Sequence, residues 1–495
     1  MILTAALVVP LLGALALALW PGWSRSAARA FAVVTTLVPL LLMVIAWSRF
    51  DTGGSMFQLV EEVDWVPSLG MGFRLGVDGI ALAVAAMTAL LFTGAAAYPV
   101  DTRGAARQYY AWILFLEMAS LGVFLALDLL LFYVFFDLTL VGMYFLIGRW
   151  GHGEPQSAAL KFFLYTLFGS LFLLLAILGL YLSADPLTFD MRELIQQQPL
   201  AGAGTFAGVV MAAFLLGFII KTPLVPFHTW LPRAHVDAPA PASAILAGVL
   251  LKMGTYGLIR IPYSMMAETF AAWALPLGIL ALVSILYGAL VALGQKDIKQ
   301  RIAYTSINHM GYAVLGIAAA GALLDGSETA RSMALIGATV EMVAHGLITG
   351  ALFLIAGSFW QRGETYRLAD YGGLSGRTPK LAGMTTVAAF ASLGLPGLAG
   401  FVAEFHIFVG TFGVYPWLAA IGLLGILITA ALFLRMLQSL FFGQLPERWN
   451  TMADLKTSEI AVLGVFMVLV VLIGVYPAFL LDIINTSARW LVGGG

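Results

Sequence analysis

The chain has 495 residues, of which 61% are hydrophobic and only 10% are charged, and its mean hydropathy is +0.96. Soluble globular chains carry about 25% charged residues, so this composition excludes a soluble domain with a single anchor and indicates a polytopic membrane protein. The formal net charge is −1, and without a basic stripe nucleic acid is not expected as a partner. Cysteine is absent, which excludes thiolate-held iron–sulfur clusters, zinc–thiolate sites and disulfides in this chain.

Apolar windows of about 20 residues, the length that crosses a bilayer as a helix, occur fourteen times. The first window lacks a basic n-region and a small-residue cleavage site, so we expect a spanning helix there and not a removed signal peptide. The sequence therefore predicts an all-α polytopic membrane protein with about fourteen transmembrane helices. These spans, numbered 1 to 14 in chain order, cover roughly 2–20, 28–47, 79–98, 109–127, 129–147, 159–182, 204–224, 241–261, 271–293, 302–320, 333–359, 383–410, 416–441 and 459–480.

Two segments outside the predicted spans are informative, one for its composition and one for its length. The loop at 48–78 is acidic, and the alternation in FQLVEEVDW predicts a short external β-hairpin. After span 14 about fifteen residues remain, too few for a soluble domain.

The distribution of lysine and arginine predicts the orientation. With the N-terminus outside, seventeen of these residues lie at inner loops or helix ends and six in outer loops, Arg260 among the six and Lys299 among the seventeen. The positive-inside rule is then obeyed, with both termini on the outer side of a bacterial inner (plasma) membrane.

Four ionisable side chains lie within the predicted spans: Asp137, Lys221, Lys252 and Glu404. A charge at the bilayer centre costs roughly 2.5–3.5 kcal/mol on insertion scales and normally faces a bundle interior or a water path. Two acids and two bases at this depth indicate a proton relay. If a lysine such as Lys221 made and broke an ion pair with an acid such as Asp137, it would take up and release a proton.

Two of the predicted spans are interrupted next to these charges. Pro223 and Pro226 follow Lys221, and Pro396 precedes Glu404 among several glycines. Proline cannot continue helical hydrogen bonding, and broken helices near the midplane are a recurring device of ion transporters. The breaks in helices 7 and 12 are five spans apart. This offset reverses direction in the membrane, and it predicts two inverted five-helix repeats, spans 4–8 and 9–13.

Histidines supply further groups that titrate near neutral pH. His309 and His345 lie in or near spans, and His228 lies at the inner mouth of span 7 with His235. The alternatives are ordinary packing histidines, a Lys221 that snorkels to the interface, and static hydrogen-bonded acids. Three further groups are weaker candidates or incidental: Glu117, Glu341 and His406.

Five segments resemble the antiporter-like membrane subunits of respiratory complex I, from about residue 75 onward. They are KTPLVPFHTWLPRAHVDAPAPASAILAGVLLKMGTYGLIR, QKDIKQRIAYTSINHMGY, MVAHGLITGALFLIAG, LPGLAGFVAEF and FYVFFDLTLVGMYFLIGRWG. The resemblance implies two inverted half-channels joined by a hydrophilic axis. The expected division is 1–108 for helices 1–3 and an external loop, 109–261 and 262–441 for the two repeats, and 442–495 for helix 14 and a short tail.

The same resemblance implies roles for individual residues. The acid of span 5 falls on Asp137, the lysines of spans 7 and 8 on Lys221 and Lys252, and the ionisable group of span 12 on Glu404. The connecting histidines fall on His228, His309 and His345. Glutamate at position 404 is typical of the M (chain 4) branch of the family, whereas sister subunits resemble each other in having lysine there. Asp137 departs from the family, which usually has glutamate.

The implied function is proton translocation as a subunit of a complex I type NADH–quinone oxidoreductase, driven by quinone reduction elsewhere. No cofactor is expected in this chain; NADH, FMN, iron–sulfur clusters and quinone are expected on partner subunits. Neighbouring antiporter-like subunits and the lipid bilayer are the expected partners. The alternatives are a subunit of an Mrp-type cation/proton antiporter or of a hydrogenase-linked ion pump, and a purely structural membrane scaffold.

Overall fold

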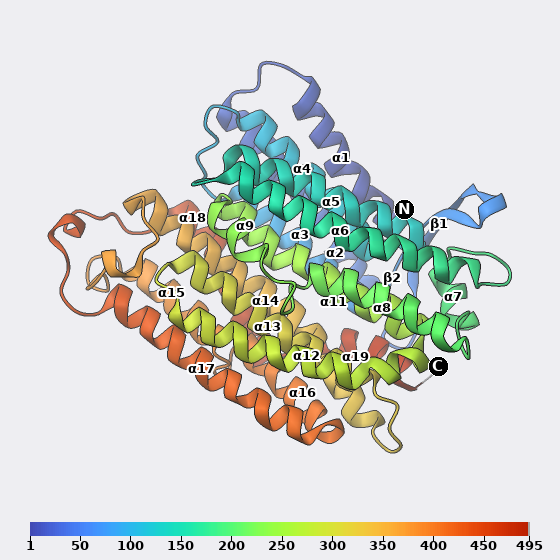
Figure 1. The fold of residues 1–495 in the computed structure, drawn as a ribbon. Coiled ribbons are helices and arrows are strands. Elements are labelled where there is room, and N and C mark those ends of the chain that lie inside the picture. The colour runs from blue at the N-terminus through green and yellow to red at the C-terminus, as the bar shows by residue number, and fades with distance from the viewer. Residues whose placement is uncertain (494–495) are drawn as a thin grey trace.

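A computed structural model describes residues 1–493 as a bundle of long, roughly aligned helices (Figure 1). Twelve helical segments in these residues are long and apolar enough to cross a membrane. They are α1 (Ile2–Leu19), α2 (Arg25–Arg49), α3 (Gly79–Ala97), α4 (Ala106–Leu125), α5 (Leu129–Trp150), α6 (Pro155–Leu182), α8 (Gly204–Lys221), the composite helix Ala240–Tyr263, α12 (Ala267–Gly294), α14 (Glu328–Gly363), α17 (Pro416–Phe441) and α18 (Thr457–Val475). The prediction of a multi-span helical membrane protein is confirmed.

The remaining two predicted spans are helices of a different kind. Span 10 is α13 (Ile298–Gly321), which is 24 residues long and almost wholly buried, so its sequence carries polar residues that a lipid-facing helix would avoid. Span 12 is divided into α15 (Pro379–Ser392) and α16 (Ala399–Val414), each too short to cross alone. With these two, the helices follow the fourteen predicted windows in order.

The predicted break in span 7 lies between α8 and the short helix α9 (Leu231–Asp237). Proline was expected to leave carbonyls without partners here, and the structure supplies replacements. The carbonyl of Ile219 accepts a hydrogen bond from the amide of Leu224 at 3.1 Å, and that of Ile220 accepts one from the indole of Trp230 at 3.0 Å. Backbone groups freed inside a membrane protein must be satisfied in this way.

Span 8 is one continuous helix built from four segments. Two α-helical segments, α10 (Ala240–Ile245) and α11 (Leu251–Leu258), alternate with two π-helical turns, η2 (Leu246–Leu250) and η3 (Ile259–Tyr263). All of its most apolar window is buried, because it runs through the centre of the bundle between α3 and α14.

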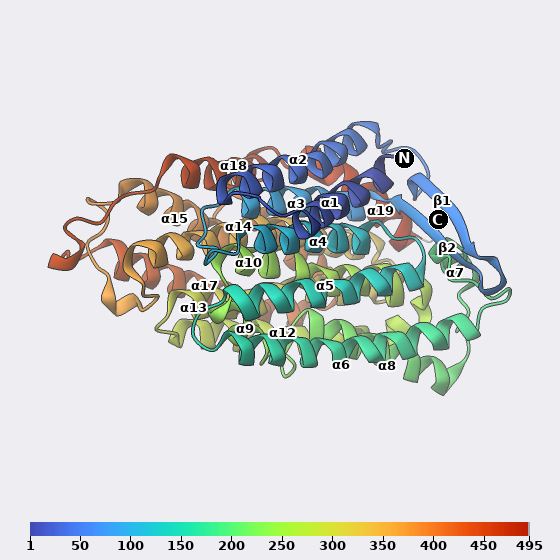
Figure 2. The same ribbon diagram turned by 90° about the horizontal axis from the view of Figure 1, so that it is seen from above.

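The two termini lie at the same end of the bundle, at the right in Figures 1 and 2. The predicted hairpin is present there as the antiparallel pair β1 (Gln58–Val66) and β2 (Met71–Val77). Two further helices lie at this end, α7 (Met191–Gln197) and α19 (Ala478–Gly493). Three single 3-10 turns complete the elements: η1 (Pro67–Leu69), η4 (Leu368–Asp370) and η5 (Glu447–Trp449).

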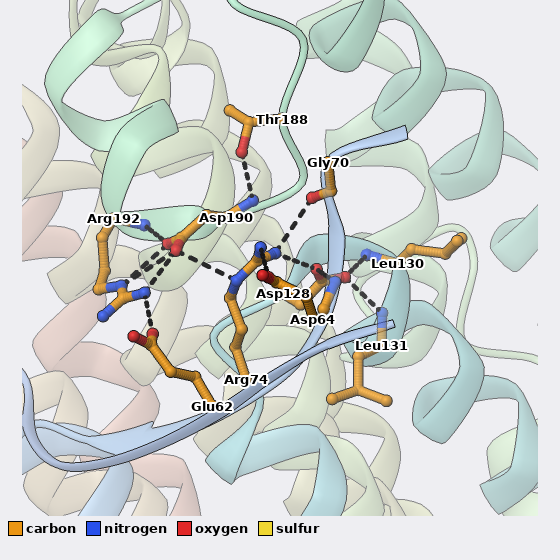
Figure 3. A network of polar contacts seen from close by, with 11 residues as sticks. Glu62, Asp64, Gly70, Arg74, Asp128, Leu130, Leu131, Thr188, Asp190 and Arg192 are labelled. Atoms are coloured by element: carbon orange, nitrogen blue, oxygen red, sulfur yellow. Dashed lines mark hydrogen bonds and ion pairs between the residues drawn. The ribbon is translucent and has the colours of Figure 1, made fainter. Parts of the chain in front are cut away.

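An ionic network fixes the hairpin to the bundle (Figure 3). Arg74 on β2 pairs with Asp128 at 3.0 Å and with Asp190 at 3.5 Å, and Arg192 bridges Asp190 and Glu62 at 2.6 Å each. Asp128 also caps the N-terminus of α5 through the amides of Leu130 and Leu131. The hairpin, α5 and α7 are therefore held by shared carboxylates.

Several lysines and arginines that the charge distribution assigned to loops or helix ends are in fact buried in the protein. They are not solvated loop charges. Their charged groups find carbonyl or carboxylate partners inside the protein, so burial does not leave them unpaired. The buried cations of this kind are Arg260, Lys299, Arg301 and Arg331.

Candidate functional site

A chain of buried polar groups crosses the centre of the bundle. It starts at Lys252 on α11, whose ammonium lies 2.6 Å from the carbonyl oxygen of Ala247 and 2.5 Å from Nδ1 of His345 on α14. The ring of His345 lies 5.3 Å from the ring of His309 on α13, centroid to centroid. Lys252 is fully buried, and both histidines are nearly so.

His309 is the branch point of this chain. Its Nδ1 lies 3.0 Å from Oε1 of Glu341, one turn before His345 on α14, and its Nε2 lies 3.1 Å from the hydroxyl of Ser392. Ser392 is the last residue of α15, at the break of span 12. Five buried side chains from α11, α13, α14 and α15 thus form two hydrogen-bonded groups that meet where the rings of His345 and His309 pack together, with Nε2 of His345 left without a partner. We call this set the central chain: Lys252, His345, His309, Glu341 and Ser392.

Glu404 on α16 lies beyond this break. Its carboxyl group lies against Gly394, which has a φ of +74°, and a Cβ at that position would collide with the carboxyl oxygens. Glu404 also lines a cavity of about 490 Å³ whose other walls are mostly aromatic and aliphatic, including Phe401, Phe405 and Phe408. The span 12 acid is therefore buried at the junction of the helix break and an apolar cavity.

Lys221, the last residue of α8, is 1% exposed, which excludes the alternative of a lysine snorkelling to the interface. Its ammonium contacts the hydroxyl of Thr139 at 3.3 Å and lies 4.7 Å from the ring centroid of Phe136, both on α5. The Asp137–Lys221 ion pair suggested from the sequence is not formed at 4.0 Å or less between these two described residues. The carboxyl group of an aspartate reaches one methylene less far from the backbone than that of a glutamate.

Asp137 itself is half-buried on α5. Its Oδ1 is shielded from solvent and has no hydrogen-bond partner. The groups that interact with Asp137 include the hydroxyls of Tyr133 and Ser170 and the ammonium of Lys221. The acid and the lysine therefore occupy one neighbourhood, separated by a gap that a side-chain rotation or a water molecule would bridge.

His228 lies in the break of span 7, beside a polar cavity. This cavity of about 570 Å³ is lined by charged groups such as Glu154, Arg233 and Asp237. The His228 ring packs edge-on against Tyr287 with centroids 5.0 Å apart, and its Nδ1 has no partner. Partial burial lowers the pKa of His228, with a smaller contribution from the charge of Lys161. A cavity with polar and charged walls therefore lies next to the break in span 7.

Two buried groups between this cavity and Lys252 were not chosen from the sequence. His235 on α9 is fully buried, stacks on Phe353 at 4.4 Å, and has no partner for either ring nitrogen. The Lys299 ammonium caps α9 by donating to the carbonyls of His235 at 3.1 Å and Ala238 at 2.5 Å. Apart from its nearness to His228, the signal in the sequence was the short segment LPRAHVD between two proline-containing breaks.

The remaining sequence candidates lie apart from the central chain or extend it. Glu117 on α4 is completely buried, and both of its oxygens lack partners. Nδ1 of His406 donates to the carbonyl oxygen of Val402, 2.7 Å away on the same helix. Glu341, weighed only as a weaker candidate from the sequence, is a direct partner of His309.

The arrangement suits proton transfer and offers little for other chemistry. Neutral imidazoles both accept and donate protons, and hydrogen-bonded carboxyl, hydroxyl and ammonium groups complete such a path. Within residues 1–493 no group of three or more His, Asp or Glu side chains is placed to hold a metal ion.

The chain is also similar in sequence to known membrane proteins. A family model described as NADH:quinone oxidoreductase/Mrp antiporter, TM, matches residues 126–429. The NADH-quinone oxidoreductase subunit M of Rhodobacter capsulatus is 40% identical over 476 residues, covering 93% of this chain and 88% of the relative. The F(420)H(2) dehydrogenase subunit M of Methanosarcina mazei is 36% identical over 476 residues, covering 95% and 94%.

The fold is also similar to that of chains in solved structures of membrane complexes. A chain of respiratory complex I from Thermus thermophilus with bound NADH is 31% identical, with a TM-score of 0.87 and complete coverage of both chains. A chain of the Mrp complex from Dietzia sp. DQ12-45-1b has a TM-score of 0.86 at 24% identity, covering 100% of this chain and 52% of that one, and shares the fold. The chain belongs to the NADH:quinone oxidoreductase/Mrp antiporter family of membrane subunits.

Proposed function

We propose that this chain is the proton-translocating antiporter-like subunit, of the M (chain 4) type, in a complex I type NADH–quinone oxidoreductase of a bacterial inner membrane. Energy would come from quinone reduction in other subunits, which would hold NADH, FMN, the iron–sulfur clusters and the quinone. Neighbouring antiporter-like subunits and the bilayer would surround it, with both termini on the outer side. The names of the relatives and their coverage support this assignment.

The observation that carries the proposal is the central chain. Lys252 belongs to the proposed first repeat, 109–261, and the histidines, Glu341 and Ser392 belong to the second, 262–441. The flanking parts would be 1–108 and 442–495. A hydrogen-bonded contact of 2.5 Å joins the two repeats at Lys252 and His345, so a proton that arrives at Lys252 has a buried acceptor directly beside it.

The proposed path begins at the cavity beside His228 and reaches Lys221, which Asp137 would stabilise in its charged state. It continues through Lys252, His345 and His309 and ends near Glu404. Moving one charge against 100 mV costs about 2.3 kcal/mol. Breaking a single buried hydrogen-bonded charge contact is on the same scale, about 1.5–3 kcal/mol. One rearrangement per proton would therefore suffice.

Proton pumping by the native complex tests this function. Membrane vesicles carrying Lys252→Met would be compared with wild type for NADH-driven acidification, normalised to the rate of quinone reduction and to the amount of assembled complex. Methionine has a similar length without a charge, so packing is retained. We expect coupled transport to fall at least about tenfold, which corresponds to a barrier increase of about 1.4 kcal/mol.

Lys380→Met is the matched control, because Lys380 is exposed at the start of α15. Normal pumping by assembled Lys252→Met complex would contradict the proposal and favour a scaffold. A purified native assembly without flavin and iron–sulfur subunits, active in cation/proton exchange, would favour the Mrp-type alternative.

A further inference from the structure

A second polar column leaves the central chain along span 8. Tyr256 and Arg260 follow Lys252 at intervals of one helical turn, on the same face of the helix. The guanidinium Nε of Arg260 donates to the Tyr256 hydroxyl at 3.1 Å, and that hydroxyl donates to the carbonyl of Phe124 at 3.1 Å. The column points from Lys252 toward the end of the bundle that holds the termini and the hairpin.

The column ends in a completely buried ion pair. Arg260 Nη2 lies 2.6 Å from Oδ1 of Asp78, and the two side chains are 1% and 0% exposed. Asp78 also caps α3 by accepting from the amide of Ala81 at 2.8 Å. The next residue, Gly79, donates its amide to Ser487 of α19 at 2.7 Å. Span 8, α3 and α19 therefore meet at this pair.

A wide cavity lies just beyond the pair. Its volume is about 670 Å³, and its walls include Phe57, Arg192, Tyr263 and Ser264. The guanidinium carbon of Arg260 lies 4.9 Å from the centroid of the Phe57 ring. The ring of Phe57 therefore lies between Arg260 and a cavity whose walls are mostly apolar with a few polar groups. A proton leaving Lys252 along this column would meet Tyr256 and then the ion pair.

We infer that the Arg260–Asp78 pair is a proton barrier that closes the outward end of span 8, an inference that rests on the proposed function. A proton path needs groups that both release and accept protons. Arginine cannot be deprotonated in proteins and has no acceptor, and fixed arginines exclude protons from other membrane pores. Oδ1 of Asp78 accepts from both the guanidinium of Arg260 and the amide of Ala81. The barrier directs protons from Lys252 to His345 instead of outward.

The barrier predicts a passive leak when both charges are removed. The complex carrying Arg260→Gln together with Asp78→Asn would be reconstituted in liposomes, and the decay of an imposed pH gradient would be followed without NADH. The amides can still hydrogen-bond to each other, and asparagine still caps a helix well. We expect proton permeability to rise at least about tenfold above wild type.

The matched control is the double variant Arg362→Gln with Glu459→Gln. That pair is also joined at 2.6 Å and well buried, but it lies between α14 and α18, away from the column, so no leak is expected. An assembled Arg260/Asp78 variant as tight as this control would overturn the inference.

A second variant keeps the inference testable if the double variant does not assemble. Phe57→Ala widens the cavity toward Arg260 and leaves the ion pair intact. We expect it to stay proton-tight, and a leak would show that the ring, and not the pair, forms the seal. Because leak is measured without turnover, it is independent of the pumping test: loss of pumping in Lys252→Met can coexist with a tight Arg260/Asp78 variant, and the reverse also holds.

Discussion

The ammonium of Lys252 and Nδ1 of His345, 93 residues apart in the chain, approach to 2.5 Å in the buried centre of the bundle. The contact needs a neutral acceptor on His345, because two cations at this distance in a low-dielectric interior would repel strongly. Protonation of one partner therefore opposes protonation of the other. Under the proposed function, a proton that leaves Lys252 would therefore have His345 as its acceptor.

His345→Phe tests this contact directly. Phenylalanine keeps the ring and removes both nitrogens, so the Lys252 proton loses its acceptor. We expect redox-driven proton transport to fall roughly tenfold, or about 1.4 kcal/mol, with assembly preserved. The assay is vesicle acidification per NADH oxidised. His406→Phe is the control, since the hydrogen bond of His406 is to the backbone of its own helix, and equal effects in the two variants would argue against the central chain.

Removing the hydroxyl of Ser392 should reduce proton transport by a smaller factor. Ser392→Ala removes the partner of His309 Nε2 at 3.1 Å, and one neutral hydrogen bond is worth about 0.5–1.5 kcal/mol. Transport should therefore slow by roughly two- to tenfold. Ser392→Thr retains a hydroxyl and should restore most of the rate. If alanine and threonine behave alike in the acidification assay, the proton does not pass this residue.

Lengthening the acid at position 137 should strengthen its coupling to Lys221. Asp137→Glu adds one methylene and lets the carboxylate reach an ammonium that now contacts Thr139. We expect transport equal to or above wild type, whereas Asp137→Asn, which removes the charge, should reduce it several-fold. Initial rates of proton uptake at limiting NADH should decrease in the order Asp137→Glu, wild type, Asp137→Asn. A glutamate variant slower than wild type would contradict the explanation that Asp137 is too short to reach Lys221.

The break in span 12 gives a steric prediction. Gly394→Ala places a methyl group at a φ of +74° and against the Glu404 carboxyl. Gly397→Ala has a φ of +90° with no atom within 4 Å of the added carbon, so it carries backbone strain alone, about 1–2 kcal/mol. Thermal unfolding of the purified complex should show similar losses for both, but pumping should fail only in Gly394→Ala. Equal pumping would mean that Glu404 tolerates displacement.

Arg74 is expected to be essential for the anchored hairpin. Its removal in Arg74→Gln leaves Asp128 and Asp190 buried near each other without their shared cation (Figure 3). Breaking a buried pair from one side costs about 3–5 kcal/mol. Hydrogen exchange should then become faster in β1, β2 and the start of α5. Adding Asp128→Asn should recover part of the protection, and no recovery would indicate that the loss is one of packing.

The sequence predicted the spans well because a bilayer enforces length and hydropathy on each helix. It also located the breaks, since Pro223, Pro226 and Pro396 lie beside the charged residues and cannot continue helical hydrogen bonding, although Pro10, Pro39 and Pro276 are accommodated inside continuous helices. The four candidate charges stood out because each is costly in an apolar window. Hydropathy, proline positions and charges in apolar windows are all read from adjacent residues, so they can be recognised without knowing which helices pack together.

The contacts between buried polar side chains could not be predicted from the sequence. The contacts of His309 with Glu341 and Ser392 join residues 32 and 83 positions apart, and no pattern along the chain encodes such distances. Arg260 and Lys299 were assigned to loops or helix ends by the charge distribution, yet Asp78 and the carbonyls of α9 allow them to be buried. The missing Asp137–Lys221 contact likewise depends on side-chain reach in three dimensions.

The two π-helical turns of span 8 enclose Lys252 between them. Each such turn holds roughly one more residue than an α-turn does. If one turn tightened while the other loosened, the intervening segment Leu251–Leu258 would rotate about its own axis by about 100° and move along it by about 1.5 Å, the angle and rise of a single residue in an α-helix. Such a change would point the side chain of Lys252 in a second direction while the ends of span 8 stayed in place.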